Sequence, residues 1–248
     1  ATMFPKEEAA QVLIIGGWGD GPLNAVRETA RSLGFGVVDV AVPMPPAGCR
    51  WLLNPFVVLL LGIAYGTYAG CTYAMSLLPT AAAAAAICGV LVVSFVAARL
   101  TVAMVVRFAI LQGVWAAQRA LRSRVALVVG FSWGGGIAHA LVARGLWRGP
   151  TLLLAPTVVL MSRASFAAYP SSFDASSAVV FAASCDDFCP PAETAALYEG
   201  LGAATRNVQD NHVLRRNTTL TGIIDTVRTL LAAECSFVQP SPGAKKNT

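Results

Sequence analysis

The stretch VALVVGFSWGGGIAHAL, residues 125–141, decides the fold. It opens with an apolar, β-branched run that predicts a strand over 125–129, and its end predicts a helix over 135–144. Between them, a serine is bracketed by glycines. Such a serine is either a nucleophile held on a strained strand-to-helix turn or a neighbour of glycines that only let two backbones pack closely. The rest of the chain must supply catalytic partners before the first interpretation holds.

Strand and helix signals alternate on both sides of this stretch. Each strand segment is short and apolar, and turn residues follow it. This alternation predicts an α/β protein with a mostly parallel, doubly wound sheet covered by helices on both faces. Further strands are expected in QVLII (11–15), FGVVDVAV (35–42), TLLLAP (151–156), SAVVFAAS (177–184) and near 205–209, and a last helix over 219–233.

An uncharged segment interrupts the pattern. Hydrophobic residues make up 56% of the 248-residue chain and charged residues only 12%, about half the charged share usual in soluble domains. The 48 residues between Arg50 and Arg99 include no Asp, Glu, Lys, Arg or His. They divide into 56–78 and 81–98, each near the ~20 residues that cross a bilayer. We therefore expect a transmembrane helical hairpin; buried globular helices are the alternative, which the length of the run disfavours.

The insertion sets the expected domain organisation. Because both of its flanks belong to one sheet, they must lie on the same side of the bilayer, so the number of crossings is even. From Arg99 the chain is expected to return as an amphipathic helix, whose first turns lie along the membrane surface. The expected parts are the first part of the α/β domain at 1–50, the hairpin at 51–99, the remainder of the domain at 100–238 and a polar tail at 239–248.

Three polar segments follow predicted strands. GFSWG (130–134) fits the G-x-S-x-G pattern, SCDDFCPP (184–191) follows the strand at 177–184, and DNHVL (210–214) follows the strand near 205–209. The carboxyl ends of parallel strands share one edge of a sheet, where active sites of open α/β sheets lie. The segments therefore bring a serine, an acid and a histidine to that edge.

With these motifs the chain resembles the α/β-hydrolase family. VLIIGGWGD (12–20) is similar to the family's early strand and oxyanion loop, GFSWGG to its nucleophile elbow, SCDDFCPP to its acid turn with Cys189 in the valine place, and DNHVL to its histidine loop. The order serine, acid, histidine is also the family's. The resemblance covers roughly 11–42 and 101–233, with the hairpin as an insertion.

The resemblance implies a role for each residue. Ser132 would attack an acyl carbon and His212 would take its proton. Asp186 would orient and stabilise the imidazolium, with Asp187 as the alternative acid. Taken singly, each residue also has an ordinary interpretation: the histidine as a chance loop residue, the acid as a cap for the helix that begins near Pro191.

The resemblance also implies the oxyanion donors. The backbone N–H groups of Trp18 and Trp133 would hold the oxyanion, and Gly130 and Gly134 would let the strand and helix approach. Gly16 stands where many relatives have a histidine. The other histidine of the chain, His139, is expected to be a surface or packing residue.

These observations predict a membrane-anchored serine hydrolase, of carboxylesterase, lipase or thioesterase type, that cleaves an ester or thioester without metal or cofactor. The alternative is a catalytically idle hydrolase-like accessory subunit of a larger mitochondrial or plastid membrane complex. The expected partners are membrane lipid and a small acyl substrate, and for the alternative other membrane-protein subunits.

Nucleic acid is not expected, because the basic residues behind the net charge of +5 are scattered. The six cysteines form no disulfide or metal pattern, and Ala1 in place of methionine is compatible with a lost presequence and equally with a trimmed chain.

Overall fold

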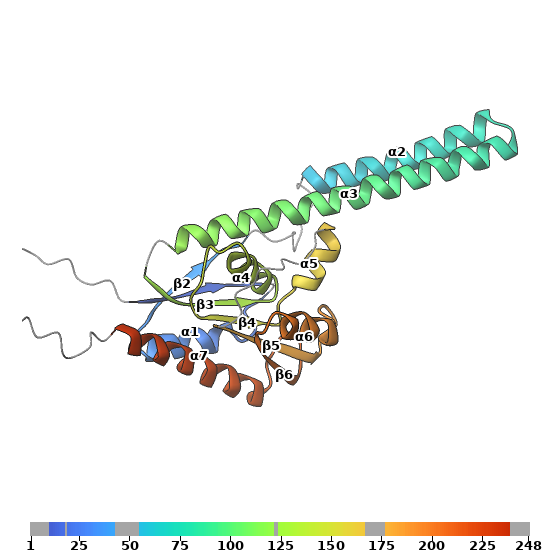
Figure 1. The fold of residues 1–248 in the computed structure, drawn as a ribbon. Helices are drawn as coiled ribbons and strands as arrows, with labels where there is room; N and C mark the ends of the chain where they lie inside the picture. The colour runs from blue at the N-terminus through green and yellow to red at the C-terminus, as the bar shows by residue number, and fades with distance from the viewer. Residues whose placement is uncertain (1–9, 18, 43–54, 122–123, 167–176, 239–248) are drawn as a thin grey trace, which may run out of the picture. The chain divides into compact units, whose positions relative to one another are not determined.

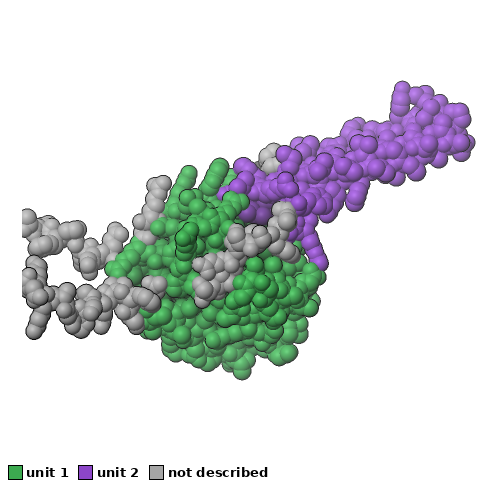
Figure 2. Space-filling model, viewed as in Figure 1, with its two compact units in different colours: residues 1–42, 112–161, 168–248 green, residues 43–111, 162–167 purple. Residues whose placement is uncertain are grey.

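The computed structural model describes residues 10–17, 19–42, 55–121, 124–166 and 177–238. The chain divides into two compact units (Figure 2): unit 1 comprises 1–42, 112–161 and 168–248, and unit 2 comprises 43–111 and 162–167. The described part of unit 1 holds the sheet, and unit 2 holds most of the two longest helices. Unit 2 therefore interrupts unit 1 in the chain.

The sheet has six strands in the order β2-β1-β3-β4-β5-β6, and every neighbouring pair is parallel (Figure 1). This confirms the predicted α/β class with a parallel sheet surrounded by helices. The strands are β1 (Gln11–Ile15), β2 (Gly36–Val40), β3 (Val125–Phe131), β4 (Thr151–Leu154), β5 (Ala178–Cys185) and β6 (Ala204–Asn211).

The burial of the strands agrees with their positions in the sheet. β1, β3 and β4 are central, and nearly all their residues are buried, as expected for strands covered on both faces. β6 lies at one edge and is mostly exposed and polar, which suits an edge strand that must not pair with another chain.

Helices cover the sheet on both sides. α1 (Leu23–Ser32) and α7 (Asn217–Val238) pack against each other on one face, whereas α4 (Trp133–Ala143) packs on β1, β3 and β4 (Figure 1). α6 (Pro191–Gly200) contacts β5 and β6, and α5 (Val158–Ser165) follows β4. The last helix is thus longer at both ends than the predicted 219–233.

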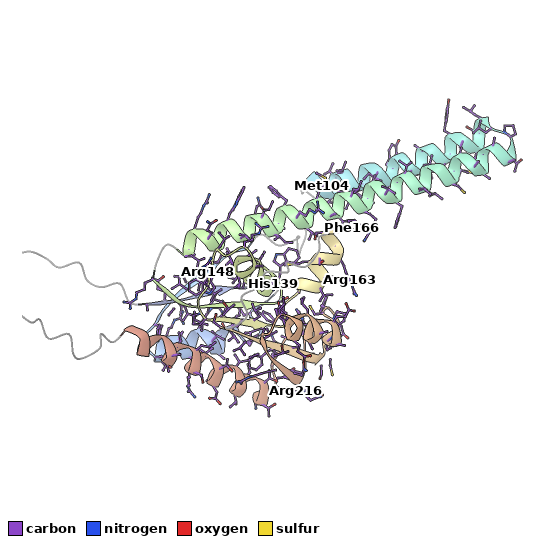
Figure 3. The ribbon with its side chains drawn as sticks, in the orientation of Figure 1. Met104, His139, Arg148, Arg163, Phe166 and Arg216 are labelled. Carbon is purple, nitrogen blue, oxygen red and sulfur yellow. The ribbon has the colours of Figure 1, made fainter. Side chains whose placement is uncertain are left out.

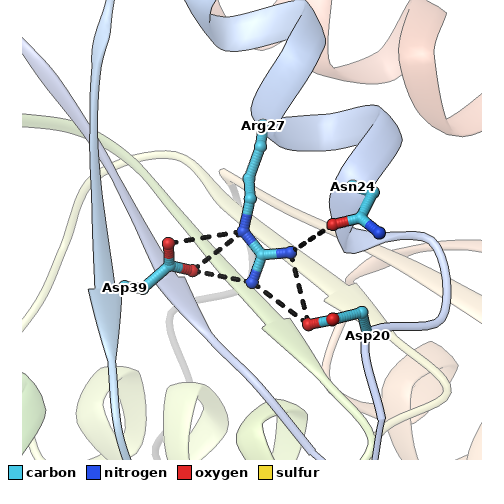
Figure 4. Close-up of polar contacts among 4 residues, drawn as sticks. All are labelled: Asp20, Asn24, Arg27 and Asp39. Carbon is cyan, nitrogen blue, oxygen red and sulfur yellow. Dashed lines mark hydrogen bonds and ion pairs between the residues drawn. The ribbon is translucent and has the colours of Figure 1, made fainter.

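A polar network joins α1 to the edge strand β2 (Figure 4). The guanidinium of Arg27 donates to Asp39 at 2.8 Å, to Asn24 at 2.7 Å and to Asp20 at 3.3 Å. The hydrogen bond to Asp39 raises the pKa of Arg27 above its usual value. Through Asp20 the network reaches the last residue of the predicted oxyanion segment, in the loop that follows β1.

Unit 2 contains a helical hairpin made of α2 (Pro55–Leu77) and of α3 (Thr80–Ala120) as far as Leu111. The hydroxyl of Thr67 on α2 lies 2.6 Å from that of Ser94 on α3, and Gly70 faces Val90 closely enough that an added Cβ would lie 3.4 Å from it. By length and composition alone, both helices are able to cross a membrane, and only 6% of the most apolar stretch of each is buried.

α3 differs from the prediction. An amphipathic helix was expected from Arg99, and the structure has a helix there, but as the continuation of the second hairpin helix, in one uninterrupted helix of 41 residues. The helix continues because residues 90–112 contain no proline or glycine that would end or kink it. At 1.5 Å per residue α3 is ~62 Å long, about twice the thickness of the hydrocarbon layer.

Candidate active site

The turn between β3 and α4 holds Ser132 in a strained conformation. Its φ of 54° and ψ of −119° lie outside the regions that residues with a side chain favour. Its N–H donates to the carbonyl of Leu154 at 2.9 Å, and its carbonyl accepts from Gly136 N–H and from both the N–H and the hydroxyl of Thr157, each at 3.2 Å. Four hydrogen bonds thus hold the strained residue in place. No sequence motif marks Thr157, and only its position after β4 points to the site.

Glycines make this turn possible. A Cβ on Gly130 would lie 2.6 Å from the carbonyl oxygen of Gly134 and 2.7 Å from Cβ of Ala138. A Cβ on Gly134 would overlap the carbonyl oxygen of Ile15. α4 therefore approaches both its own strand and β1 to a distance that only glycine permits.

The structure brings Ser132, His212 and Asp186 together. The hydroxyl of Ser132 lies 2.7 Å from Nε2 of His212, and Nδ1 of His212 lies 2.8 Å from Oδ2 of Asp186. With the imidazole proton on Nδ1, His212 donates to the carboxylate and accepts from the serine hydroxyl. Both end members are buried, since Ser132 is 4% and the Asp186 side chain 2% exposed. This is the hydrogen-bonded arrangement by which a base activates a serine.

The acid in contact with His212 is Asp186. Its other oxygen, Oδ1, accepts from the backbone N–H groups of Phe188 and Cys189, each at 2.8 Å. Both oxygens are thereby occupied and the carboxylate is held in one orientation. Asp187 is exposed. In this described region the N-cap of α6 is Pro190 and no side chain caps the helix, so the helix-cap interpretation of the acid does not hold.

The loop that carries His212 is fixed by its neighbours. The buried carboxylate of Asp210 accepts from the N–H groups of Asn211 and Arg216 at 2.8 and 2.9 Å. The rings of Phe131 and Phe188 lie 5.8 and 5.1 Å from the imidazole, centroid to centroid. None of these neighbours was predicted, although Asp210 belongs to the DNHVL segment and Phe188 to the acid turn.

Two loops supply candidate oxyanion donors. Trp133 is the first residue of α4, so its N–H lies at the positive end of the helix dipole next to Ser132. Gly17 lies against Ser132, because a Cβ added to it would lie 3.0 Å from the serine Oγ. Trp18, the other predicted donor, lies outside the described residues.

Asp186, His212 and Cys189 each offer a ligand atom within 4.8 Å of one another, as in a metal site. The ligand atoms of Asp186 and His212 are engaged in hydrogen bonds with each other, with Ser132 and with backbone N–H groups. Burial, with the charge of Asp186 adding to it, raises the pKa of the Cys189 thiol to about 12.

His139 packs in the interior (Figure 3). It is 2% exposed, and its Nδ1 lies 3.2 Å from the hydroxyl of Tyr198 on α6. Burial lowers the pKa of His139 to about 4, so the ring is neutral at pH 7. Of the two histidines, only His212 contacts the serine.

Comparisons with known proteins support the fold. No protein-family model matches the chain, and no curated protein matches it. Among solved structures, a protein from Xanthomonas campestris pv. campestris assigned to the alpha/beta superfamily of hydrolases superposes with a TM-score of 0.53 at 16% identity, covering 90% of this chain and 99% of that one. A Pyrococcus furiosus esterase superposes with a TM-score of 0.48 at 10% identity, covering 91% and 82%. The likeness to the Xanthomonas protein shows that the chain has an α/β-hydrolase fold.

Proposed function

We propose that this protein is a membrane-anchored serine hydrolase that cleaves an ester or thioester through an acyl-enzyme. The observation that carries the proposal is the hydrogen-bonded series from Asp186 through His212 to Ser132, at 2.8 and 2.7 Å, on a strained turn. Strained residues that their surroundings hold in place are concentrated at functional sites, and four hydrogen bonds hold Ser132. A nucleophile that must project from the turn explains both.

The proposed reaction has two halves. Ser132 Oγ attacks the acyl carbon while Nε2 of His212 takes its proton, and collapse of the tetrahedral intermediate expels the alcohol or thiol, which His212 protonates. The acyl group is then bonded to Ser132. A water molecule, deprotonated by His212, attacks it and releases the acid, and the serine recovers its proton. Asp186 accepts from Nδ1–H throughout and stabilises the imidazolium.

The oxyanion of each intermediate is proposed to bind two backbone N–H groups. One is that of Trp133, at the N-terminus of α4. The other is that of Trp18, in the loop whose Gly17 lies against Ser132. Donors fixed in the backbone need no reorganisation as charge develops, which makes them effective in lowering the barrier.

The hairpin and the surroundings of His212 suggest the substrate class. The ring of Phe188 is 52% exposed and lies beside the imidazole, so an apolar group of the substrate can contact it. The chain leaves the sheet for the hairpin after β2, at the carboxyl edge that also carries the serine. A lipid-like acyl ester or thioester, taken from the bilayer in which the hairpin is embedded, suits both features.

Hydrolysis by the purified full-length chain in mild detergent tests the proposal. p-Nitrophenyl esters with acyl chains of two to sixteen carbons are the probes, with a thioester series beside them. We expect turnover that rises with chain length, and we expect S132A to lower kcat by at least about a thousandfold. Turnover equal in the two proteins, or turnover of none of the probes, would contradict it.

The alternative function is a catalytically idle accessory subunit of a larger organellar membrane complex. The observation that favours it is the extensive exposed apolar surface of α2 and α3. Size in mild detergent separates the two functions: an enzyme alone migrates as a small micelle-bound particle, whereas a subunit extracted from its native membrane co-migrates with a much larger assembly.

A further inference from the structure

One face of α2 carries a row of hydroxyl-bearing residues. They recur at spacings of three and four residues, so they lie along one side of the helix over about 16 Å. Three tyrosines and three small residues line a shallow, open hollow of about 330 Å³ on this side. The residues of this tyrosine face are Tyr65, Tyr68, Ala69, Thr72, Tyr73 and Ser76.

The tyrosine face is turned away from α3. At 100° per residue it lies opposite Thr67, Gly70 and Ala74, the side of α2 that packs on α3. The rings of Tyr65, Tyr68 and Tyr73 are 74%, 71% and 69% exposed. Nothing in the described part of the hairpin covers them.

This position is unfavourable in lipid. α2 runs from Pro55 to Leu77, so Tyr65 and Tyr68 lie near the middle of the span, whereas tyrosines that face lipid gather at the membrane surfaces. The hydroxyls of Thr72 and Ser76 donate to carbonyls of their own helix. The three phenol hydroxyls have no partner among the described residues, and an unpaired hydroxyl in hydrocarbon costs free energy.

We propose that the tyrosine face of α2 is a self-association surface that binds the same face of a second copy within the membrane. A phenol hydroxyl both donates and accepts, so one face pairs with itself about a two-fold axis. All copies cross the bilayer in the same direction, so matching residues meet at the same depth. This inference rests on the proposed membrane anchoring.

Energy transfer between two fluorophore-labelled populations of the full chain, reconstituted in phosphatidylcholine vesicles, tests the proposal. Interhelical hydrogen bonds in membranes contribute about 0.6 kcal/mol each, roughly a threefold change in affinity. Replacing Tyr65, Tyr68 and Tyr73 with phenylalanine removes one such hydrogen bond for each tyrosine. The loss of these three bonds is expected to weaken association by roughly 20- to 30-fold. The matched control is Phe95→Leu on α3, a residue 68% exposed and outside the tyrosine face, which we expect to leave association unchanged.

Alkaline carbonate extraction of the same vesicles separates the two proposals. A chain that carbonate releases would overturn membrane anchoring, and this inference with it. A chain that stays in the membrane but shows no energy transfer would overturn self-association alone. Transfer that the triple phenylalanine variant leaves intact would also overturn it, because another surface would then hold the copies together.

Discussion

At the scale of single residues, the two adjacent aspartates offer a matched pair. Asp186 contacts His212 through a buried carboxylate, whereas Asp187 is exposed. We expect D186N to lower kcat by up to about 10⁴-fold, because the amide favours the wrong imidazole tautomer. D187N should stay within about twofold of the parent. Steady-state kinetics on the best ester checks both, and equal losses in the two variants would assign the acid role to neither.

His139 makes stability depend on pH. Its pKa is about 4 in the folded chain against 6.5 when unfolded, so the unfolded state binds the proton first as pH falls. The free energy of unfolding is therefore highest above pH 6.5 and decreases as the pH falls from 6.5 to 4. At pH 5 the decrease is roughly 2 kcal/mol. Thermal unfolding in detergent at pH 7.5 and 5.0 measures this. H139F should show a smaller fall over the same range; an unchanged fall would mean that other groups cause it.

At the scale of elements, the strand-to-helix turn requires glycine. Gly130→Ala places a Cβ against Gly134 and Ala138, so the backbone must move. We expect a loss of about 2 kcal/mol in the free energy of unfolding, together with loss of activity. Gly200→Ala at the end of α6 is the control, because nothing lies within 4 Å of its added Cβ. It should be neutral or stabilising in urea unfolding; similar losses at both sites would refute the steric argument.

Elements were predictable where a local pattern decides them. The apolar runs predicted the strands and, together with the glycines, placed Ser132 between a strand and a helix. The start of α4 was predicted two residues late, because glycines have low helix propensity, and a sequence does not show that Ile15, Pro156 and Met161 leave no room for a Cβ at Gly134, Gly135 and Gly136. Thr157 was not predicted because its hydrogen bonds to Ser132 join residues that are 25 positions apart in the sequence, and no local pattern shows such a contact.

At the scale of the whole molecule, the hairpin is predicted to anchor the chain. Val92 and Val93 are 63% and 68% exposed near the middle of the apolar half of α3. Replacing both with lysine costs about 2.5–3.5 kcal/mol each in a bilayer, so the variant should move to the carbonate-soluble fraction. Leu146→Lys, outside the hairpin, is the control and should stay with the membrane. A double variant that remains fully membrane-bound would show that the hairpin is not the anchor.

The central claim is that Ser132 is a nucleophile activated by His212. The most direct measurement is labelling of the full chain in its membrane with a fluorophosphonate, followed by peptide mapping. We predict one phosphonylated residue, Ser132, with labelling greatly slowed by H212A and abolished by prior heat unfolding. Folded protein that carries no adduct at Ser132 after prolonged exposure would contradict the claim.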